Sequence, residues 1–317
     1  MATFRAADEV YGIDLFEEGR PGRSSAYLIR GREPILVETG SANSQEALWS
    51  GLAELGVGPE DLRHVVVTHV HLDHAGGAGQ TMARATKALL HCHPRAARHL
   101  ADPRRLEAGA RAVYGERLDA MFGPILPVAA DRIVVHEDES ALKTRDRILR
   151  FYDTPGHAKH HTCVVDEATR GIFSGDTIGI RYVPSYTGWD FVYGFPTTTP
   201  SDFDPEVMLE TLDRLEALNL RAVYHTHYGV TEPAREAFQF SRRGLRRIQQ
   251  ILPLLSDAST YEEVAEALGR QVREDLASQG HPGVDVAPLA LDLMLNSQGI
   301  LVYLQKRAQG PREGEKR

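Results

Sequence analysis

The sequence of 317 residues contains only two cysteines, Cys92 and Cys163, and they do not form a CxxC pair. A disulfide framework is therefore excluded, and a chain of this length does not need one because it can bury a large hydrophobic core. We interpret both cysteines as packed or free thiols and expect a reducing compartment.

Long apolar runs are also lacking. The N-terminal stretch MATFRAADEVYG has no apolar core of a signal peptide. The longest apolar candidate, VAPLALDLML, is interrupted by Asp292 and is far shorter than the ~18 residues that a membrane span requires. We therefore expect a cytoplasmic protein that does not cross a membrane.

An excess of basic residues is missing, with 36 Lys and Arg against 44 Asp and Glu and a net charge of −8. This balance disfavours a general nucleic-acid binder. Neither a GxSxG nucleophile motif nor a phosphate-binding glycine loop is present, which disfavours covalent serine and nucleotide-dependent mechanisms. The expected partner is a small-molecule substrate, with a homodimer left open.

The pattern of elements changes once along the chain. Up to about residue 230, short β-like runs alternate with helical patterns, and a proline-initiated helix is predicted from Asp204-Pro205 to about Leu218. After Thr231 three helical patterns follow, and ILVYLQK is open between a strand and a helix. We predict an α/β catalytic domain over residues 1–232 and a small, mostly helical module with a frayed tail over residues 233–317.

The stretch VVVTHVHLDHAGG concentrates polar donors at the end of a buried strand. His69, His71, Asp73 and His74 fall within six residues, more donors than one tetrahedral ion needs once distant ligands are added. Candidate distant ligands follow later strands at His157 in DTPGH, Asp176 in FSGDT and His227 in YHTHYG, with His225 as a competitor of His227. The sequence therefore predicts a metal site at one edge of a sheet.

Taken in order, THVHLDHAGG, TPGHAKHH, SGDT and THYG resemble the metal-binding motifs of the metallo-β-lactamase-fold hydrolases over roughly residues 10 to 230. The resemblance implies a four-layer αββα sandwich with a two-metal site at one edge. It implies that one metal is held by His69, His71 and His157. It implies that the second is held by Asp73, His74 and His227, with Asp176 bridging the two.

The implied cofactors are two Zn²⁺ ions per chain, with iron or manganese as alternatives because the donors are oxygen and nitrogen. A hydroxide shared by the two ions would be the nucleophile. One departure from the family is visible, because the usual Asp-Thr-Gly is here Glu38-Thr39-Gly40. We expect the longer acid to support the metal loop from behind the ligands.

Further site residues are predicted around the metals. Asp73 is counted with the catalytic residues, and His161 is expected either to line the pocket and donate to an oxyanion or to pack the loop. The segment YVPSYTGWDFVYGF carries six aromatic residues, and it would either wall the pocket or pack against its own domain. The substrate-contact candidates are Tyr186, Trp189, Tyr193, Phe195 and Tyr228. A run of arginines, Arg235, Arg242, Arg243, Arg246 and Arg247, is interpreted as a solvated face, with an anion-binding patch as the alternative.

The resulting prediction is a binuclear metal-dependent hydrolase. A thioesterase that resembles hydroxyacylglutathione hydrolase is favoured, with a lactonase or a phosphodiesterase or nuclease as alternatives. The short interval between Asp176 and His227 leaves no room for the large domain that RNA-processing members insert there. A mono-iron persulfide dioxygenase is the alternative of another class. A non-catalytic binding protein is disfavoured because all seven ligands are present.

Overall fold

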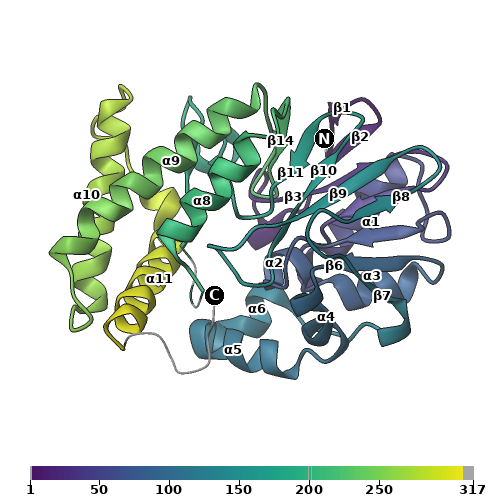
Figure 1. The fold of residues 1–317 in the computed structure, drawn as a ribbon, viewed down its shortest axis with the longest axis horizontal. Coiled ribbons are helices and arrows are strands. Elements are labelled where there is room, and N and C mark those ends of the chain that lie inside the picture. The colour runs from purple at the N-terminus through teal and green to yellow at the C-terminus, as the bar shows by residue number, and fades with distance from the viewer. Residues whose placement is uncertain (1, 199, 201, 310–317) are drawn as a thin grey trace.

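A computed structural model describes residues 2–198, 200 and 202–309, and two β-sheets form its centre (Figure 1). The first sheet has seven strands in chain order. They are β1 (Thr3–Ala7), β2 (Val10–Asp14), β3 (Ser25–Ile29), β4 (Ile35–Val37), β5 (His64–Val66), β6 (Leu89–Cys92) and β7 (Ile133–Val135). From β4 to β7 the strands run parallel, so their carboxyl ends lie along one edge of the sheet.

The second sheet has six strands in the order β15-β14-β11-β10-β9-β8. They are β8 (Ala141–Lys143), β9 (Ile148–Asp153), β10 (Thr162–Asp166), β11 (Gly171–Phe173), β14 (Ala222–Tyr224) and β15 (Val230–Thr231). A separate hairpin pairs β12 (Ile180–Tyr182) with β13 (Tyr193–Phe195). The hairpin contains part of the aromatic segment that the sequence singled out.

Helices cover the outer faces of both sheets. Those before the second sheet are α1 (Gln45–Glu54), α2 (Leu72–Ala75), α3 (Ala78–Arg84), α4 (Pro94–Ala101), α5 (Arg104–Tyr114) and α6 (Leu118–Phe122). Between β11 and β14 of that sheet the chain forms α7 (Pro184–Thr187) and α8 (Pro205–Glu216), and after β15 it forms α9 (Ala234–Ile251), α10 (Tyr261–Ser278) and α11 (Ala290–Gln309). The layers are helix, sheet, sheet and helix (Figure 1), which confirms the αββα sandwich.

Three hydrophobic clusters hold these layers together. One lies between the sheets and includes Tyr27, Phe151 and Phe173. A second packs α1 and α3 on the first sheet. The third joins the second sheet to α8 and continues without a break into α9, α10 and α11. The chain changes character at Ala234, but the C-terminal helices share a core with the preceding domain.

Helix ends agree with the sequence where a side chain caps them. Asp204 accepts hydrogen bonds from the amides of Glu206 and Val207 and starts α8 as predicted. A capping box starts α10 and pairs Thr260 with Glu263. Helix α1, in contrast, begins at Gln45 with no side-chain cap.

The last helix resolves the ambiguity of ILVYLQK, which continues α11. By length and composition the segment Ala287–Gln309 could cross a membrane, although 44% of its apolar window is buried inside the protein. Asp292 in this segment forms a doubly hydrogen-bonded ion pair with Arg23, both bonds being 2.7 Å long. We therefore interpret α11 as a core helix of the sandwich.

Candidate metal centre

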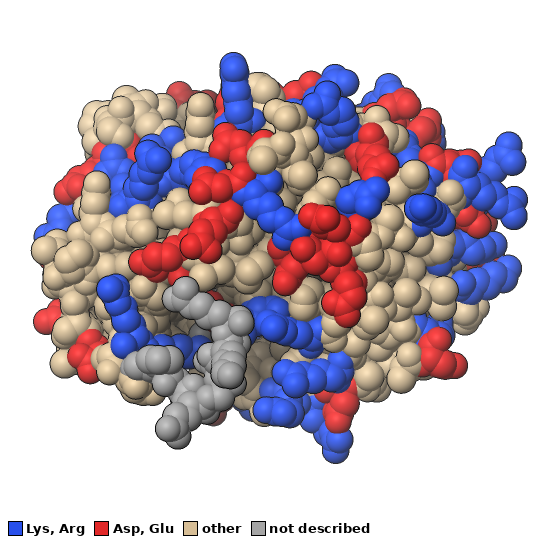
Figure 2. All heavy atoms as spheres, in the orientation of Figure 1, with Lys and Arg blue, Asp and Glu red and all other residues tan. Residues whose placement is uncertain are grey.

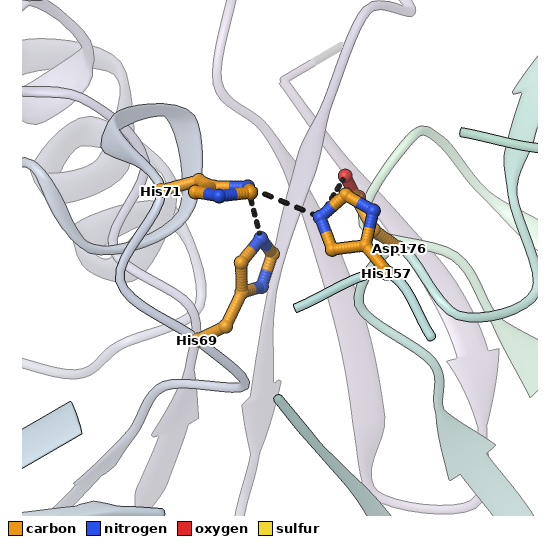
Figure 3. Close-up of side chains that lie close together, drawn as sticks. All are labelled: His69, His71, His157 and Asp176. Atoms are coloured by element: carbon orange, nitrogen blue, oxygen red, sulfur yellow. Dashed lines mark hydrogen bonds and ion pairs between the residues drawn. The ribbon is translucent and has the colours of Figure 1, made fainter. Parts of the chain in front are cut away.

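The predicted ligands converge at one edge of the sandwich, where loops leave the ends of β5, β9, β11 and β14. His69 Nε2 lies 2.9 Å from His71 Nδ1, and that atom lies 3.1 Å from His157 Nε2. Figure 3 shows the three rings turned toward one another, with Asp176 beside His157. These four residues form the first group of candidate ligands.

A second group adjoins the first and contains Asp73, His74 and His227. Asp73 Oδ2 lies 3.6 Å from His74 Nε2 and 3.4 Å from His227 Nε2. Asp176 stands between the groups. Its Oδ2 is 3.3 Å from His157 Nε2, and its Oδ1 is 3.0 Å from the Nε2 atoms of both His74 and His227. The two oxygens of one carboxylate therefore face different groups.

The donor atoms fit metal ions better than they fit each other. His74 Nε2 and Asp176 Oδ1 are buried and 3.0 Å apart, yet among the described residues neither has a hydrogen-bond partner. A buried polar atom without a partner costs about 1–3 kcal/mol, and a shared cation would remove that cost for both. The set contains nitrogen and oxygen but no thiolate, which suits zinc, iron or manganese.

The tautomers of two ligand histidines follow from their other hydrogen bonds. Thr68 Oγ1 donates to Glu38 and so accepts from His69 Nδ1 at 3.0 Å. Thr197 Oγ1 donates to the carbonyl of Asp176 and so accepts from His157 Nδ1 at 2.7 Å. In both rings Nε2 is left unprotonated and directed at the centre.

Glu38 is the acid that departs from the family motif. Its side chain is fully buried, and Oε1 accepts from Thr68 Oγ1 and from His74 Nδ1 at 3.0 Å. The expected support of the metal loop therefore has a defined contact, the imidazole of His74. Neither Thr68 nor Thr197 was predicted from the sequence to belong to the site. Thr68 directly precedes His69, whereas nothing in the local pattern marks Thr197.

The electrostatics of the centre separate its histidines into two kinds. Burial lowers the pKa of His69 well below its usual range and that of His157 to about 3, so both rings are neutral. Burial would also lower the pKa of His74, but the carboxylates of Asp176, Asp73 and Glu38 raise it well above its ordinary value. The carboxylate side of the centre therefore demands positive charge, which a cation supplies as well as a proton.

His161 occupies the second of the two positions that we considered, packed within the loop region. The ring is fully buried, Nδ1 lies 2.7 Å from Thr154 Oγ1, and Nε2 accepts from the amide of Asp176 at 3.1 Å. Gly175 permits this approach, because a Cβ there would lie 2.4 Å from His161 Nε2 at a φ of +47°. His161 therefore positions the backbone of Asp176 and does not face substrate.

Of the two histidines in YHTHYG, His227 reaches the ligand group. His225 Nε2 instead lies 2.9 Å from Thr231 Oγ1, and its ring stacks on Phe240. Tyr228 does not face the centre either, because its ring contacts Phe4 and its hydroxyl faces Asp14. Contact between Tyr228 and substrate therefore stays a prediction that the position of the ring does not support.

The aromatic segment packs against its own protein, which was the second of the two interpretations. Tyr193 and Phe195 are fully buried in the core shared with α9. Tyr186 is buried beneath the guanidinium groups of Arg20 and Arg23. Trp189 is half-buried and donates to the carbonyl of Asp285 in the C-terminal module. The proposed pocket wall is therefore an internal contact between the two parts of the chain.

The centre opens to solvent at two ligands only. Asp73 is 30% exposed and His71 is half-buried, whereas His74 and Asp176 are buried. Tyr114 at the end of α5 lies near this mouth. Burial raises the pKa of its hydroxyl, and the charges of Asp73 and Asp176 add to the rise. Nothing in the sequence near Tyr114 links α5 to the ligands, so its position was not predicted.

Comparison with known proteins agrees with this geometry. The profile of the family described as the Metallo-beta-lactamase superfamily matches residues 19–227. An Atrochrysone carboxyl ACP thioesterase of Aspergillus fumigatus is 25% identical over 280 residues, covering 85% of this chain and 74% of the relative.

Two solved structures share the fold. A metallo-beta-lactamase superfamily protein from Sulfolobus tokodaii has a TM-score of 0.64 at 20% identity, covering 92% of this chain and 97% of that one. A metallo-beta-lactamase family protein from Thermus thermophilus has a TM-score of 0.63 at 23% identity, covering 89% and 97%.

Proposed function

The chain belongs to the metallo-beta-lactamase superfamily, and from that premise we propose that it is a binuclear metal-dependent hydrolase of thioesters. The observation that carries the proposal is the position of Asp176. One of its oxygens faces His157, and the other lies 3.0 Å from both His74 and His227. A carboxylate in this arrangement is suited to bridge two ions.

In this proposal His69, His71 and His157 hold one ion, Asp73, His74 and His227 hold the other, and Asp176 joins them. When bound, such ions supply Lewis acidity toward a carbonyl oxygen and lower the pKa of water toward neutrality. The remaining residues orient these ligands. Glu38 and Thr68 hold His74 and His69, and His161 holds the amide of Asp176.

A thioester suits the protonation chemistry of the site. A thiolate with a pKa near 8.5 leaves without a strong proton donor, whereas an amine or alkoxide needs one. His161 cannot serve as that donor, because its ring is fully buried and both nitrogens are in hydrogen bonds. The similarity to a relative named as a thioesterase, extending over 85% of this chain, supports the same class.

The test pairs metal analysis with parallel substrate assays. We expect about two zinc ions per chain by elemental analysis, together with hydrolysis of S-lactoylglutathione or another acyl thioester. Hydrolysis of a lactone or a phosphodiester alone would agree with the proposed metal ligands but would contradict the proposed thioester substrate. One iron per chain with oxygen uptake on a persulfide would contradict the hydrolase proposal.

The variant Asp176→Asn removes the charge that would bridge the ions. We expect it to lose at least one metal ion per chain and at least about 100-fold in kcat/KM, because the position of the nucleophile depends on both ions. Asp213→Asn is the matched control, since Asp213 is a 71% exposed aspartate on α8. Equal metal content and turnover in Asp176→Asn and Asp213→Asn would refute the bridging role.

A further inference from the structure

Three exposed arginines near the mouth of the metal centre take part in none of the ion pairs between described residues. Arg95 and Arg98 lie on α4 and Arg105 lies at the start of α5, and within the described residues none of them has a carboxylate within 4.0 Å. Their neighbours differ, because Arg104 pairs with Asp102 and Arg111 pairs with Glu107 and Asp119. We call Arg95, Arg98, His99 and Arg105 the α4–α5 basic strip.

The strip is continuous with the half-buried ligand His71. The ring of His160 lies 5.6 Å from that of His71, and the ring of His99 lies 6.2 Å from that of His160. Arg98 Nε donates to His99 Nε2 at 3.2 Å. Arg95 Nη1 donates to the carbonyl of Lys159, in the loop that carries His157, at 3.2 Å. The strip is therefore two ring spacings from the ligands on one side of the mouth.

Geometry brings the strip onto one surface. Arg95, Arg98 and His99 are spaced i, i+3 and i+4, so they share a face of α4. Burial lowers the pKa of His99, and the charges of Arg98 and Arg105 lower it further, so both guanidinium groups lie near this ring. Figure 2 shows Lys and Arg side chains gathered beside the hollow in the lower part of the view, where Figure 1 draws α4 and α5.

Unpaired guanidinium groups that lie close together repel one another. An anion bound between them attracts both groups and so replaces this repulsion by a favourable interaction. The strip is positively charged, although the net charge of the chain is −8. Guanidinium forks match phosphate oxygens in geometry and form charge-assisted hydrogen bonds to them. The separation from the ligands means that such an anion belongs to a part of the substrate joined to the reacting carbonyl by a spacer.

We propose that the α4–α5 basic strip is a subsite for the phosphate of a phosphopantetheine thiol, so that the substrate is an acyl thioester of that thiol. This inference rests on the proposed thioester hydrolysis and names its leaving group. A pantetheine arm provides the spacer between sulfur and phosphate. Glutathione, in contrast, has carboxylates close to its sulfur and no phosphate.

The experiment compares one acyl group on two thiols, pantetheine and 4′-phosphopantetheine, with the full-length metal-loaded protein. We expect kcat/KM to be at least about 10-fold higher with the phosphate, since its oxygens accept charge-assisted hydrogen bonds from the guanidinium groups. The double variant Arg98→Ala/Arg105→Ala should lose this preference through KM, with kcat nearly unchanged. Arg104→Ala, whose guanidinium is already paired, is the matched control.

Binding measured without turnover separates the subsite from the proposed reaction. We expect calorimetry with S-methyl 4′-phosphopantetheine to show binding to the wild type and to Arg104→Ala, and at least about 10-fold weaker binding to Arg98→Ala/Arg105→Ala. Binding with this pattern but no thioester hydrolysis would uphold the subsite and overturn the proposed function. Equal turnover of the two thioesters, or binding unaffected by the double variant, would overturn the subsite and leave thioester hydrolysis intact.

The phosphate could come from a free coenzyme thioester or from a thioester on a carrier protein. The same acyl group presented on coenzyme A and on an acidic carrier protein distinguishes these sources by kcat/KM. A lower kcat/KM of Arg98→Ala/Arg105→Ala than of the wild type, on the coenzyme A thioester or on the carrier-protein thioester, supports the subsite. Retention of full activity on both forms in that variant contradicts it.

Discussion

At the scale of single residues, the hydrogen bonds behind the ligands decide how the ligands can act. Thr68 and Thr197 each accept from a histidine Nδ1, because each hydroxyl already donates to an oxygen. This direction of donation leaves Nε2 of His69 and of His157 unprotonated and directed at the centre, where a lone pair can bind a cation. Two hydroxyls that are not themselves ligands therefore determine which nitrogen faces the centre.

The substitution Glu38→Gln tests the support behind His74. The amide removes the negative charge that faces His74 Nδ1 at 3.0 Å, so the imidazole becomes a weaker ligand. We expect metal affinity to fall by about 10–100-fold, as is typical for such supporting groups. Competition with a chelator of known affinity measures the loss, and Glu33→Gln, at a less buried acid, serves as the control. An unchanged affinity would contradict the supporting role.

The substitution Tyr114→Phe tests the mouth of the site. The hydroxyl lies within the field of Asp73 and Asp176, and no hydrogen bond to it occurs among the described residues. If it donates to substrate, its loss should lower kcat/KM by about 10-fold, the effect of one hydrogen bond. Steady-state kinetics measures this loss. Metal analysis is the control, since the metal content of the variant should equal that of the wild type. Wild-type kinetics in the variant would leave the hydroxyl without a role in turnover.

At the scale of elements, three histidines link neighbouring strands of the first sheet. His64 Nδ1 in β5 lies 3.0 Å from His91 Nε2 in β6, and His91 Nδ1 lies 2.8 Å from His136 Nε2 just after β7. The ring of His136 stacks on Phe151 of the second sheet at 3.8 Å. The chain of rings is polar within an otherwise apolar layer and holds only while its members stay neutral.

This arrangement predicts loss of stability in acid. Burial lowers the pKa of His91 to about 3 and that of His136 to about 4, against about 6.5 in the unfolded chain. Below pH 6.5 the unfolded chain therefore binds protons that the folded chain excludes, and stability falls as pH falls. His91 alone should account for about 2 kcal/mol between pH 7 and pH 5.

Urea unfolding at pH 7, 6 and 5 measures this effect, with His91→Gln compared with the wild type. We expect the variant to be less stable at pH 7 but to lose less stability on acidification. At the other end of the chain of rings, burial lowers the pKa of His64, whereas the charges of Glu33 and Arg63 act on that pKa in opposite directions. Parallel pH profiles for the two proteins would show that His91 does not carry the dependence.

At the scale of the whole molecule, the C-terminal helices are part of the sandwich. Arg23, which follows β2, pairs with Asp292 of α11, and Tyr182 donates to the same carboxylate at 2.9 Å. Arg242 pairs with Asp213 and Glu216 of α8, and Arg243 and Arg247 surround the buried Asp275 of α10. Three of the five arginines of the run, Arg242, Arg243 and Arg247, therefore form partly buried ion pairs with α8 and α10, and only Arg235 and Arg246 are exposed as a solvated face requires.

Breaking the buried pair should loosen the whole module. Asp292→Ala leaves the buried guanidinium of Arg23 with only the more exposed Glu18 as an acidic partner, and we expect it to cost about 3 kcal/mol of unfolding free energy, the lower end of the range for breaking a buried ion pair. The double variant Arg23→Met/Asp292→Leu should recover most of that loss, because it removes both charges. Urea unfolding provides the measurement. A single variant as stable as the wild type would mean that the pair does not fasten α11.

What the sequence by itself determined is the kind and order of the ligands. Each ligand follows a buried strand, and short motifs such as HVHLDH preserve donor type and spacing whatever the distant chain does. The same local logic located α8, through Asp204-Pro205, and the change to helices after Thr231. These features depend on backbone preferences and periodicity within a few residues, which sequence patterns report directly.

Only the tertiary structure decided which polar and aromatic side chains reach the centre. His161 and His225 stand beside ligands in sequence but turn into the protein, and Tyr186 and Tyr193 fill a core rather than a pocket. Thr197 and Tyr114 reach the site from elements far away along the chain. The physical reason is that side-chain direction at a loop depends on the packing of the layer opposite, and that layer is supplied by residues distant in the sequence.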